Sequence, residues 1–170
     1  MRTFLVISAF FFSQLSFGQA TIEALANLFS SAFVYQNEEL LDVLMPTKQQ
    51  VIKKYKEVRP NISKEQLDRK IKKVNELHLV KKKKIKEQIN QFYNDGKNAG
   101  IAWKKAKPET QSSVIEFPLF DTEGTDEFGE FHVNVLHNNI NYTIAVYKCF
   151  HINGVWKMGD MIRFKKSEMD

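Results

Sequence analysis

The fold of this chain is decided by one stretch, NYTIAVYKCFHINGVWKMGDMIRF, which spans residues 141–164. Two runs rich in β-branched and aromatic residues meet in it at Asn153-Gly154. This dipeptide is typical of a two-residue type I′ turn, because both turn positions need a positive φ angle. The stretch therefore predicts a long antiparallel β-hairpin.

A two-residue turn also fixes the register of the hairpin, because pairing proceeds outward one residue at a time. Ile152 would face Val155, and Tyr147 would face Asp160. One face of the hairpin is mostly apolar, and we expect it to line the core or a pocket. The pocket-lining residues predicted on this face are Tyr147, Cys149, His151, Trp156, Met158 and Ile162. The other face would be solvated or would contact a protein partner. Its apolar residues are Ile144, Val146, Phe150 and Met161.

The chain upstream of the hairpin begins with three amphipathic helices, predicted over residues 19–35, 37–44 and 47–58. A fourth, much longer helix begins with the capping-box sequence Ser63-Lys64-Glu65-Gln66 and continues to Asp95-Gly96. Its apolar stripe loses phase around residues 78–84, which fits one long bent helix or two joined ones. The absence of Gly and Pro favours one helix.

Short strands follow these helices. Residues 112–120 alternate in polarity and would direct Ile115, Phe117 and Leu119 inward, while Pro118 marks the strand as an edge or a bulge. Residues 131–136 alternate as well and turn at 137–139 into the long hairpin. We therefore predict an α+β domain with a helical region, 20–98, and a four-stranded antiparallel sheet, 101–165.

The amino terminus is typical of a secretory signal peptide over residues 1–18. Arg2 precedes an apolar run, residues 4–12, that is too short to span a bilayer, and small residues lead to a cleavage site after Gly18. Cleavage after Ala20 is the close alternative, and a buried helix is the competing interpretation. We expect an exported protein, periplasmic or secreted, with residues 19–170 as one domain.

Charge lies in blocks along the chain. Residues 48–107 hold 19 Lys and Arg against 6 Asp and Glu, whereas the rest holds 6 basic against 14 acidic residues. The sharpest point is the run Lys81, Lys82, Lys83 and Lys84. These helices would either contact an anionic surface or present a solvated face neutralised by the protein's own acidic loop. Nucleic acid is not expected, because lysine predominates without interleaved aromatic residues and the protein is exported.

Few residues indicate catalysis or the binding of a metal or cofactor. The four histidines lack metal-ligand spacing, the loop 121–130 lacks the spacing of a calcium hand, and no catalytic motif or cofactor fingerprint occurs. The single cysteine, Cys149, cannot form an internal disulfide and is expected to be buried rather than reactive. Tyr147 opposite Asp160 is the one candidate acid–base pair, since a partly buried carboxylate can have a raised pKa; a structural hydrogen bond is the alternative.

Two motifs resemble those of a known family. They are Gly100-Ile101-Ala102-Trp103-Lys104-Lys105 and, in the hairpin, Asn-Gly-x-Trp-Lys-Met-x-Asp at residues 153–160. With the preceding helices they are similar to the nuclear transport factor 2-like (cystatin-like cone) superfamily, specifically its small exported bacterial members. The resemblance covers roughly the mature chain and implies a curved sheet wrapped around helices with a cavity between them. Some members are isomerases, cyclases or dehydratases, and others bind or dimerise without chemistry; only Asp160 and Tyr147 loosely match an acid–base pair.

Three kinds of function are compatible with these features. The first is an exported, non-enzymatic module that binds a small apolar ligand or a protein partner, with homodimerisation through the outer hairpin face as a compatible property. The second is a small lyase or isomerase that uses Asp160 and Tyr147. The third is an envelope-associated protein that contacts anionic surfaces through Lys81, Lys82, Lys83 and Lys84.

Overall fold

Helices come first and strands second in the chain, as the sequence predicts. A computed structural model describes residues 20–119 and 124–168. The predicted signal peptide, residues 1–18, lies outside the described residues. The helices are α2 (Ile22–Val34), α3 (Glu38–Leu44), α4 (Lys48–Val58), α5 (Lys64–Asn98) and the short 3₁₀-helix η1 (Trp103–Lys105). The strands are β1 (Glu109–Pro118), β2 (Thr125–His137), β3 (Ile140–Ile152), β4 (Val155–Lys157) and β5 (Met161–Glu168).

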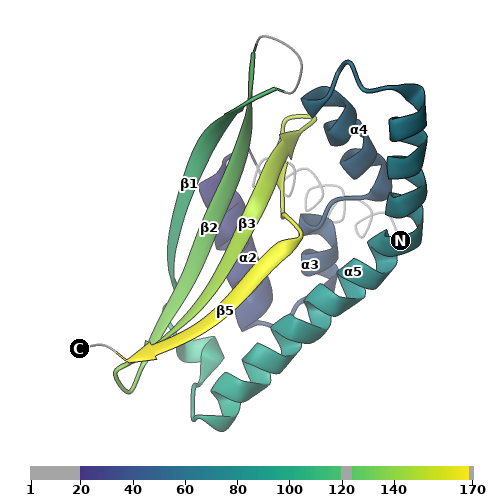
Figure 1. Ribbon diagram of the computed structural model, residues 1–170. Helices are drawn as coiled ribbons and strands as arrows, with labels where there is room; N and C mark the ends of the chain where they lie inside the picture. The colour runs from purple at the N-terminus through teal and green to yellow at the C-terminus, as the bar shows by residue number, and fades with distance from the viewer. Residues whose placement is uncertain (1–19, 120–123, 169–170) are drawn as a thin grey trace, which may run out of the picture.

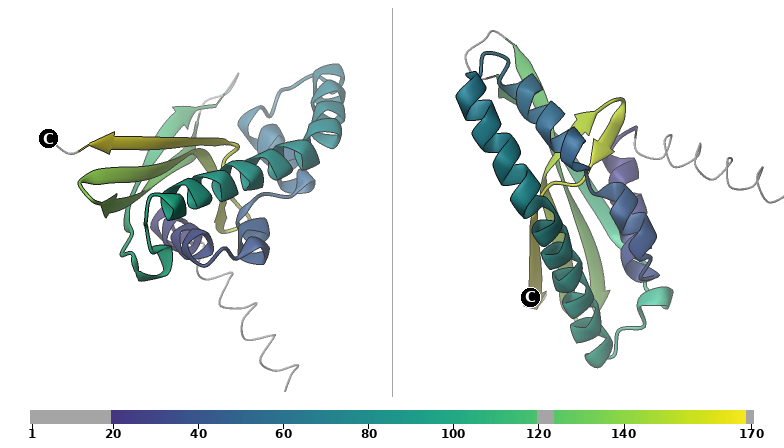
Figure 2. Two further views of the ribbon diagram at one scale, coloured as in Figure 1. Left: turned by 90° about the horizontal axis from the view of Figure 1, so that it is seen from below. Right: turned by 90° about the vertical axis from the view of Figure 1, so that its right-hand side faces the viewer.

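The strands form one curved, open antiparallel sheet with the helices packed against it (Figure 1). The strand order is β1-β2-β3-β4, and β5 also pairs with β3. Helix α2 contacts β1 and β2, while α5 runs along the length of the molecule on the same side (Figure 2). The α+β fold class is therefore confirmed, with one short strand, β4, more than the four predicted.

Side chains cap the helices at the predicted starts. The Thr21 hydroxyl accepts a hydrogen bond from the backbone N–H of Ala24 at 3.0 Å, and the Asn37 side chain accepts one from Leu40 at 2.9 Å. Each such bond satisfies a backbone donor that the first helical turn leaves without a partner. The reciprocal capping box forms at Thr47, whereas Ser63 makes only the first bond of the box predicted there.

Helix α5 is continuous over 35 residues, which confirms the prediction of one long helix. Its C-terminal half enters the core through Ile85, Ile89 and Phe92. Where the apolar stripe loses phase, the side chain of Leu79 is 67% exposed and that of Val80 is 62% exposed. The irregular pattern therefore marks a change in what the helix packs against, because the backbone itself is uninterrupted.

The predicted hairpin register holds only near the turn. Ile152 pairs with Val155 and His151 with Trp156, as predicted, and Asn153 and Gly154 both have positive φ angles. Farther out, Tyr147 pairs with Met161 instead of Asp160. The register shifts by one residue next to Lys148, whose φ angle is 58°, and the β2–β3 pairing shifts at the same level. This irregularity is a β-bulge, in which one strand contains an extra residue.

The bulge exchanges the two faces of β3, because one extra residue reverses the alternation of side chains. Ile144 and Val146, predicted on the outer face, are buried in the core. Tyr147, predicted to line an inner pocket, lies on the opposite face beside His132, with the ring centroids 5.9 Å apart. The placement of Ile144 and Val146 on the outer face is therefore wrong, whereas homodimerisation through that face stays a prediction. We call the face that bears Tyr147 and His132 the outer face of the sheet.

Strand β1 faces the opposite way from the prediction. It is an edge strand, as Pro118 indicates, but Ser112 is the residue opposite Phe131, which points into the core. Ile115 and Phe117 consequently lie on the outer face and are 46% and 47% exposed. The sequence shows that the side chains of β1 alternate in polarity. Which of the two alternating sets points inward is decided by the pairing register with β2. The sheet also starts later than predicted, because η1 occupies the segment after Ile101.

Aromatic side chains fill the space between the sheet and the helices. Trp103 lies at the centre, with its ring centroid 4.9 Å from that of Phe33 and 5.6 Å from that of Tyr93. Near the hairpin tip, a Cβ on Gly129 would lie only 2.9 Å from the Trp156 ring and 2.7 Å from Ile22. Trp156 and Met158 are 5% and 0% exposed, so side chains pack closely on the face where the resemblance implied a cavity.

Cys149 is expected to be unreactive in the folded protein. Its side chain is fully buried, and burial raises the pKa of the thiol to about 12. Because the thiolate is the reactive form, Ellman's reagent should not modify the native protein at pH 8 and should modify one thiol after unfolding in guanidinium chloride. Equal rates for native and unfolded protein would contradict this burial.

Candidate binding sites

A hollow of about 590 Å³ lies on the outer face of the sheet, beside the bulge and near the C-terminal end of α4. We call it the outer hollow. Its apolar lining consists of Val58, Ile115, Phe117, Pro118, Leu119, Phe128 and Met161. Its polar lining consists of Asp126, Glu130, Tyr147, Lys148 and Arg163. Side chains from both edges of the sheet, β1 and β5, thus meet in one apolar depression with a polar end.

The bulge accounts for the position of this hollow. It turns Tyr147 outward, where the Arg163 guanidinium lies 5.4 Å from the centre of its ring. The reversed β1 presents Ile115 and Phe117 to the same side, and Phe117 meets Phe128 edge to face with ring centroids 5.7 Å apart. Sequence reasoning missed this site because it placed Tyr147 and the β1 side chains in the core.

One end of the outer hollow contains a buried ion pair. The Lys54 ammonium donates to Asp126 Oδ1 at 2.7 Å and to the His151 carbonyl at 3.1 Å, and it lies 5.6 Å from the centre of the Phe128 ring. The other carboxylate oxygen, Asp126 Oδ2, is buried and has no hydrogen-bond partner in the described part of the chain. A buried acceptor without a partner costs free energy, and its burial also keeps Oδ2 out of contact with solvent.

A second, smaller hollow of about 120 Å³ lies between α4, α5 and the segment that joins β4 to β5. We call it the basic hollow. Its floor is apolar and includes Met45, Val51, Val74, Leu77, Ile85 and Met158. Its charged and polar rim consists of Lys70, Lys73, His78, Lys81, Lys82 and Asp160. Two members of the predicted lysine run, Lys81 and Lys82, therefore belong to a concave site.

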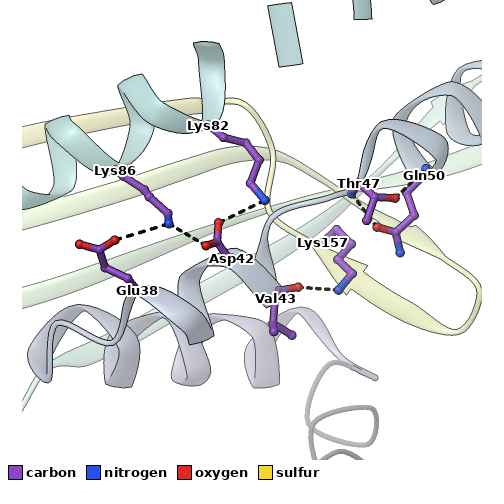
Figure 3. A network of polar contacts seen from close by, with 8 residues as sticks. All are labelled: Glu38, Asp42, Val43, Thr47, Gln50, Lys82, Lys86 and Lys157. Carbon is purple, nitrogen blue, oxygen red and sulfur yellow. Dashed lines mark hydrogen bonds and ion pairs between the residues drawn. The ribbon is translucent and has the colours of Figure 1, made fainter. Parts of the chain in front are cut away.

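The lysine run is largely paired with carboxylates of the protein itself. Lys81 binds Asp160 at 2.5 Å, and Lys83 lies 3.7 Å from Glu87 one turn along the helix. Lys82 lies 3.2 Å from Asp42, which Lys86 binds from the other side at 2.7 Å (Figure 3). The hydrogen bond from Lys86 lowers the pKa of the Asp42 carboxyl below its ordinary value. Continuous contact of all four lysines with an anionic surface would compete with these pairs.

The floor of the basic hollow is anchored by the end of α3. The Lys157 ammonium is buried and donates to the Val43 carbonyl at 2.7 Å (Figure 3), and the Met158 N–H donates to the Leu44 carbonyl at 3.0 Å. These bonds satisfy carbonyl groups that the last helical turn leaves without partners. They hold the hairpin against α3 and fix the segment that ends at Asp160.

The candidate acid–base pair does not form. Asp160 lines the basic hollow and Tyr147 lines the outer hollow, because the bulge places Met161 opposite Tyr147. Burial opposes ionisation of Asp160, but its hydrogen bond to Lys81 and the charge of that lysine outweigh burial and lower the pKa of the carboxyl. The raised pKa expected for a catalytic acid is therefore wrong, and nothing in the geometry couples these two residues.

The six predicted pocket-lining residues are dispersed. Tyr147 and Met158 line different hollows, Cys149 and Trp156 are buried in the core, and Ile162 packs partly buried against it. The sixth residue, His151, contacts Trp156 with ring centroids 5.6 Å apart, and its carbonyl accepts from Lys54. The prediction of one shared pocket is wrong, because it assumed an unbroken register.

Comparisons with known proteins identified no relative of this chain. No family model matches the chain, and no match was found among curated proteins or solved structures. Within residues 20–119 and 124–168, no helix is long and apolar enough to cross a membrane. In those same ranges, no group of three or more His, Cys, Asp or Glu residues is arranged to hold a metal ion.

Proposed function

We propose that the protein is an exported binding module whose outer hollow takes a small, uncharged apolar ligand. The observation that carries the proposal is the hollow, in which Ile115 and Phe117 stay nearly half exposed around about 590 Å³ of space. Ligand sites are typically apolar clefts of roughly 300–1,000 Å³ with a few polar groups that fix orientation. Export is supported by the signal-peptide features of residues 1–18.

The polar end of the hollow defines the chemistry of the ligand. Asp126 and Glu130 contribute two carboxylates to the lining, and Lys148 and Arg163 contribute two cations, so the lining has no net charge. An ionised ligand would lose its hydration on entering the apolar part of the hollow without gaining a net opposite charge. A neutral apolar alcohol therefore fits the site better than the ionised acid of the same chain length.

The proposal is tested with 1-decanol and decanoate as probes. We expect 1-decanol to raise the melting temperature in a saturable manner and decanoate to do so less, because a ligand stabilises the state that binds it. Removal of the aromatic contact in Phe117→Ser should weaken binding about fivefold to tenfold, as expected for loss of roughly 1–1.4 kcal/mol of apolar contact.

A matched control separates specific binding from general adsorption. Leu136 is 57% exposed on β2 and does not line the hollow, so Leu136→Ser should leave the affinity for 1-decanol unchanged. The absence of a melting shift, or an equal effect of Phe117→Ser and Leu136→Ser, would contradict the proposal.

A second copy of the chain is the competing occupant of this surface. It is favoured by the edge position of β1, where Val114, Ile115 and Phe117 are all exposed beside an unpaired strand edge. Light scattering at high protein concentration measures this directly. A dimer that dissociates in Phe117→Ser, together with no response to 1-decanol, would assign the hollow to self-association. Membership of the nuclear transport factor 2-like superfamily stays a prediction from the two sequence motifs.

A further inference from the structure

The basic hollow combines several cationic side chains with an apolar floor in a small volume. Lys70, Lys73, Leu77 and Lys81 follow one another at spacings of three and four residues, so they lie along one face of α5. The segment at Met158 and the residues before α4 close the other sides. These lysines therefore line a concave site together, with the Lys70 ammonium 4.5 Å from the centre of the Tyr55 ring.

The charge of the rim is not balanced within the hollow. Four lysines, Lys70, Lys73, Lys81 and Lys82, face a single lining carboxylate, Asp160, which leaves a net charge of +3. Asp42 lies 3.2 Å from Lys82 outside the lining but is shared with Lys86, so the effective charge of the rim lies between about +2 and +3. An anion of charge −2 complements this rim, and a phosphate monoester has a charge of about −1.5 to −2 at pH 7.

The size of the hollow fits a phosphate group better than a large ligand. Its volume of about 120 Å³ is about one fifth of the 590 Å³ of the outer hollow. The phosphate would contact the lysines, and the carbon next to its ester oxygen would contact the floor formed by Val74, Leu77 and Met158. The lysine ammonium groups are the strong donors that phosphate oxygens require.

Burial and the nearby lysine charges both act on the ionisable groups around the hollow. Burial and the neighbouring Lys81 lower the pKa of Lys70, although Asp160 acts in the opposite direction. Burial also lowers the pKa of His78, and the charges of Lys82, Lys48 and Lys81 lower it further. Burial is the largest cause of both shifts, and the charges of the neighbouring lysines act in the same direction.

We propose that the basic hollow is a binding site for the phosphate group of a phosphate monoester, formed by Lys70, Lys73, Lys81 and Lys82. The monoester can belong to a soluble metabolite or to a lipid such as phosphatidic acid, since both present the same group. The site is independent of the outer hollow, so either proposal can fail without the other.

The test is an NMR titration of the four histidine side chains against pH, with and without phenyl phosphate. A bound dianion stabilises the imidazolium form, so the pKa of His78 should rise on saturation. His132, His137 and His151 do not line the basic hollow and serve as internal controls. The lipid source is tested with phosphatidylcholine vesicles that contain phosphatidic acid, compared with phosphatidylcholine alone.

Two lysine variants distinguish a built site from diffuse attraction. Lys73 is an exposed member of the rim, and Lys84 belongs to the lysine run on the same helix but does not line the hollow. We expect Lys73→Gln to weaken binding about tenfold, as for loss of one charge-assisted hydrogen bond, and Lys84→Gln to change it less than about twofold.

Saturable binding of either phenyl phosphate or the phosphatidic acid vesicles, with this difference between the variants, supports the proposal and identifies the source. The proposal is overturned if neither probe shifts the titration of His78. It is also overturned if Lys73→Gln and Lys84→Gln weaken binding equally, because that result means general electrostatic attraction.

Discussion

Replacement of Trp103 by alanine should lower the free energy of unfolding by about 3–5 kcal/mol, the range typical of deleting a buried large aromatic side chain. Trp103 is 2% exposed, and its ring contacts those of Phe33, Phe92, Tyr93 and Tyr142. Its Nε1–H donates to the Tyr93 carbonyl at 2.8 Å. The variant would leave a cavity where α2, α5 and the sheet meet, and urea unfolding followed by circular dichroism measures the loss.

Two further variants separate packing from hydrogen bonding at this position. Trp103→Phe retains much of the apolar volume but leaves the Tyr93 carbonyl without its donor, so we expect a smaller loss than for Trp103→Ala. Leu79→Ala removes an apolar side chain that is 67% exposed on α5 and should change stability by less than about 0.5 kcal/mol. A loss below about 1 kcal/mol for Trp103→Ala would contradict its central place in the core.

Replacement of Gly159 by alanine should destabilise the protein by about 3 kcal/mol, the upper end of the usual cost of overpacking. A Cβ at Gly159 would lie 1.8 Å from the Tyr147 carbonyl oxygen and 2.6 Å from the Lys148 carbonyl carbon. These are backbone atoms of the bulge and cannot rotate away. Either the segment before β5 or the bulge itself would have to move, and urea unfolding again reports the change.

A substitution at Lys148 tests the same β-bulge and should have the opposite effect on stability. Lys148 has a left-handed backbone conformation, with a φ angle of 58°, in which a side chain is strained and glycine is not. Lys148→Gly should therefore leave stability unchanged or raise it by up to about 1 kcal/mol. A clear loss of stability in Lys148→Gly, or none in Gly159→Ala, would show that the bulge is misplaced.

The parts of the fold that were predictable from sequence are those governed by local chemistry. Thr21 and Asn37 cap helices where their positions predict, and Asn153-Gly154 forms the turn because few other dipeptides adopt two positive φ angles. The continuity of α5 up to Asp95 follows from the absence of Gly and Pro, and the helix then continues through Gly96 to Asn98. These features depend on residues within a few positions of one another.

The bulge could not be predicted with the same rules. The dipeptide Tyr147-Lys148 does not indicate a left-handed backbone conformation, since lysine is not among the residues that favour it. The available signal was Gly159, because a glycine within a strand pattern often marks a bulge or a close backbone approach. Taking the strand as unbroken placed Tyr147 in the core and Ile144 outside, the reverse of their positions.

Both hollows depend on contacts between distant segments, which explains why the sequence did not reveal them. The outer hollow joins β1 to the bulge, and its buried pair links Lys54 to Asp126, 72 positions apart. The basic hollow joins the lysine run to Asp160, 79 positions from Lys81. The lysine run correctly indicated a concentration of positive charge. The structure adds that Asp160 and Asp42 pair with two of its lysines.

The most direct test of the proposed function is a methyl NMR titration of the protein with 1-decanol. We expect saturable shifts for Ile115 and Met161, which line the outer hollow, and none for the core residues Ile144 and Met158. These pairs match in residue type and differ only in position. Shifts at Ile144 and Met158, or no saturable shift at Ile115 and Met161, would contradict ligand binding in the outer hollow.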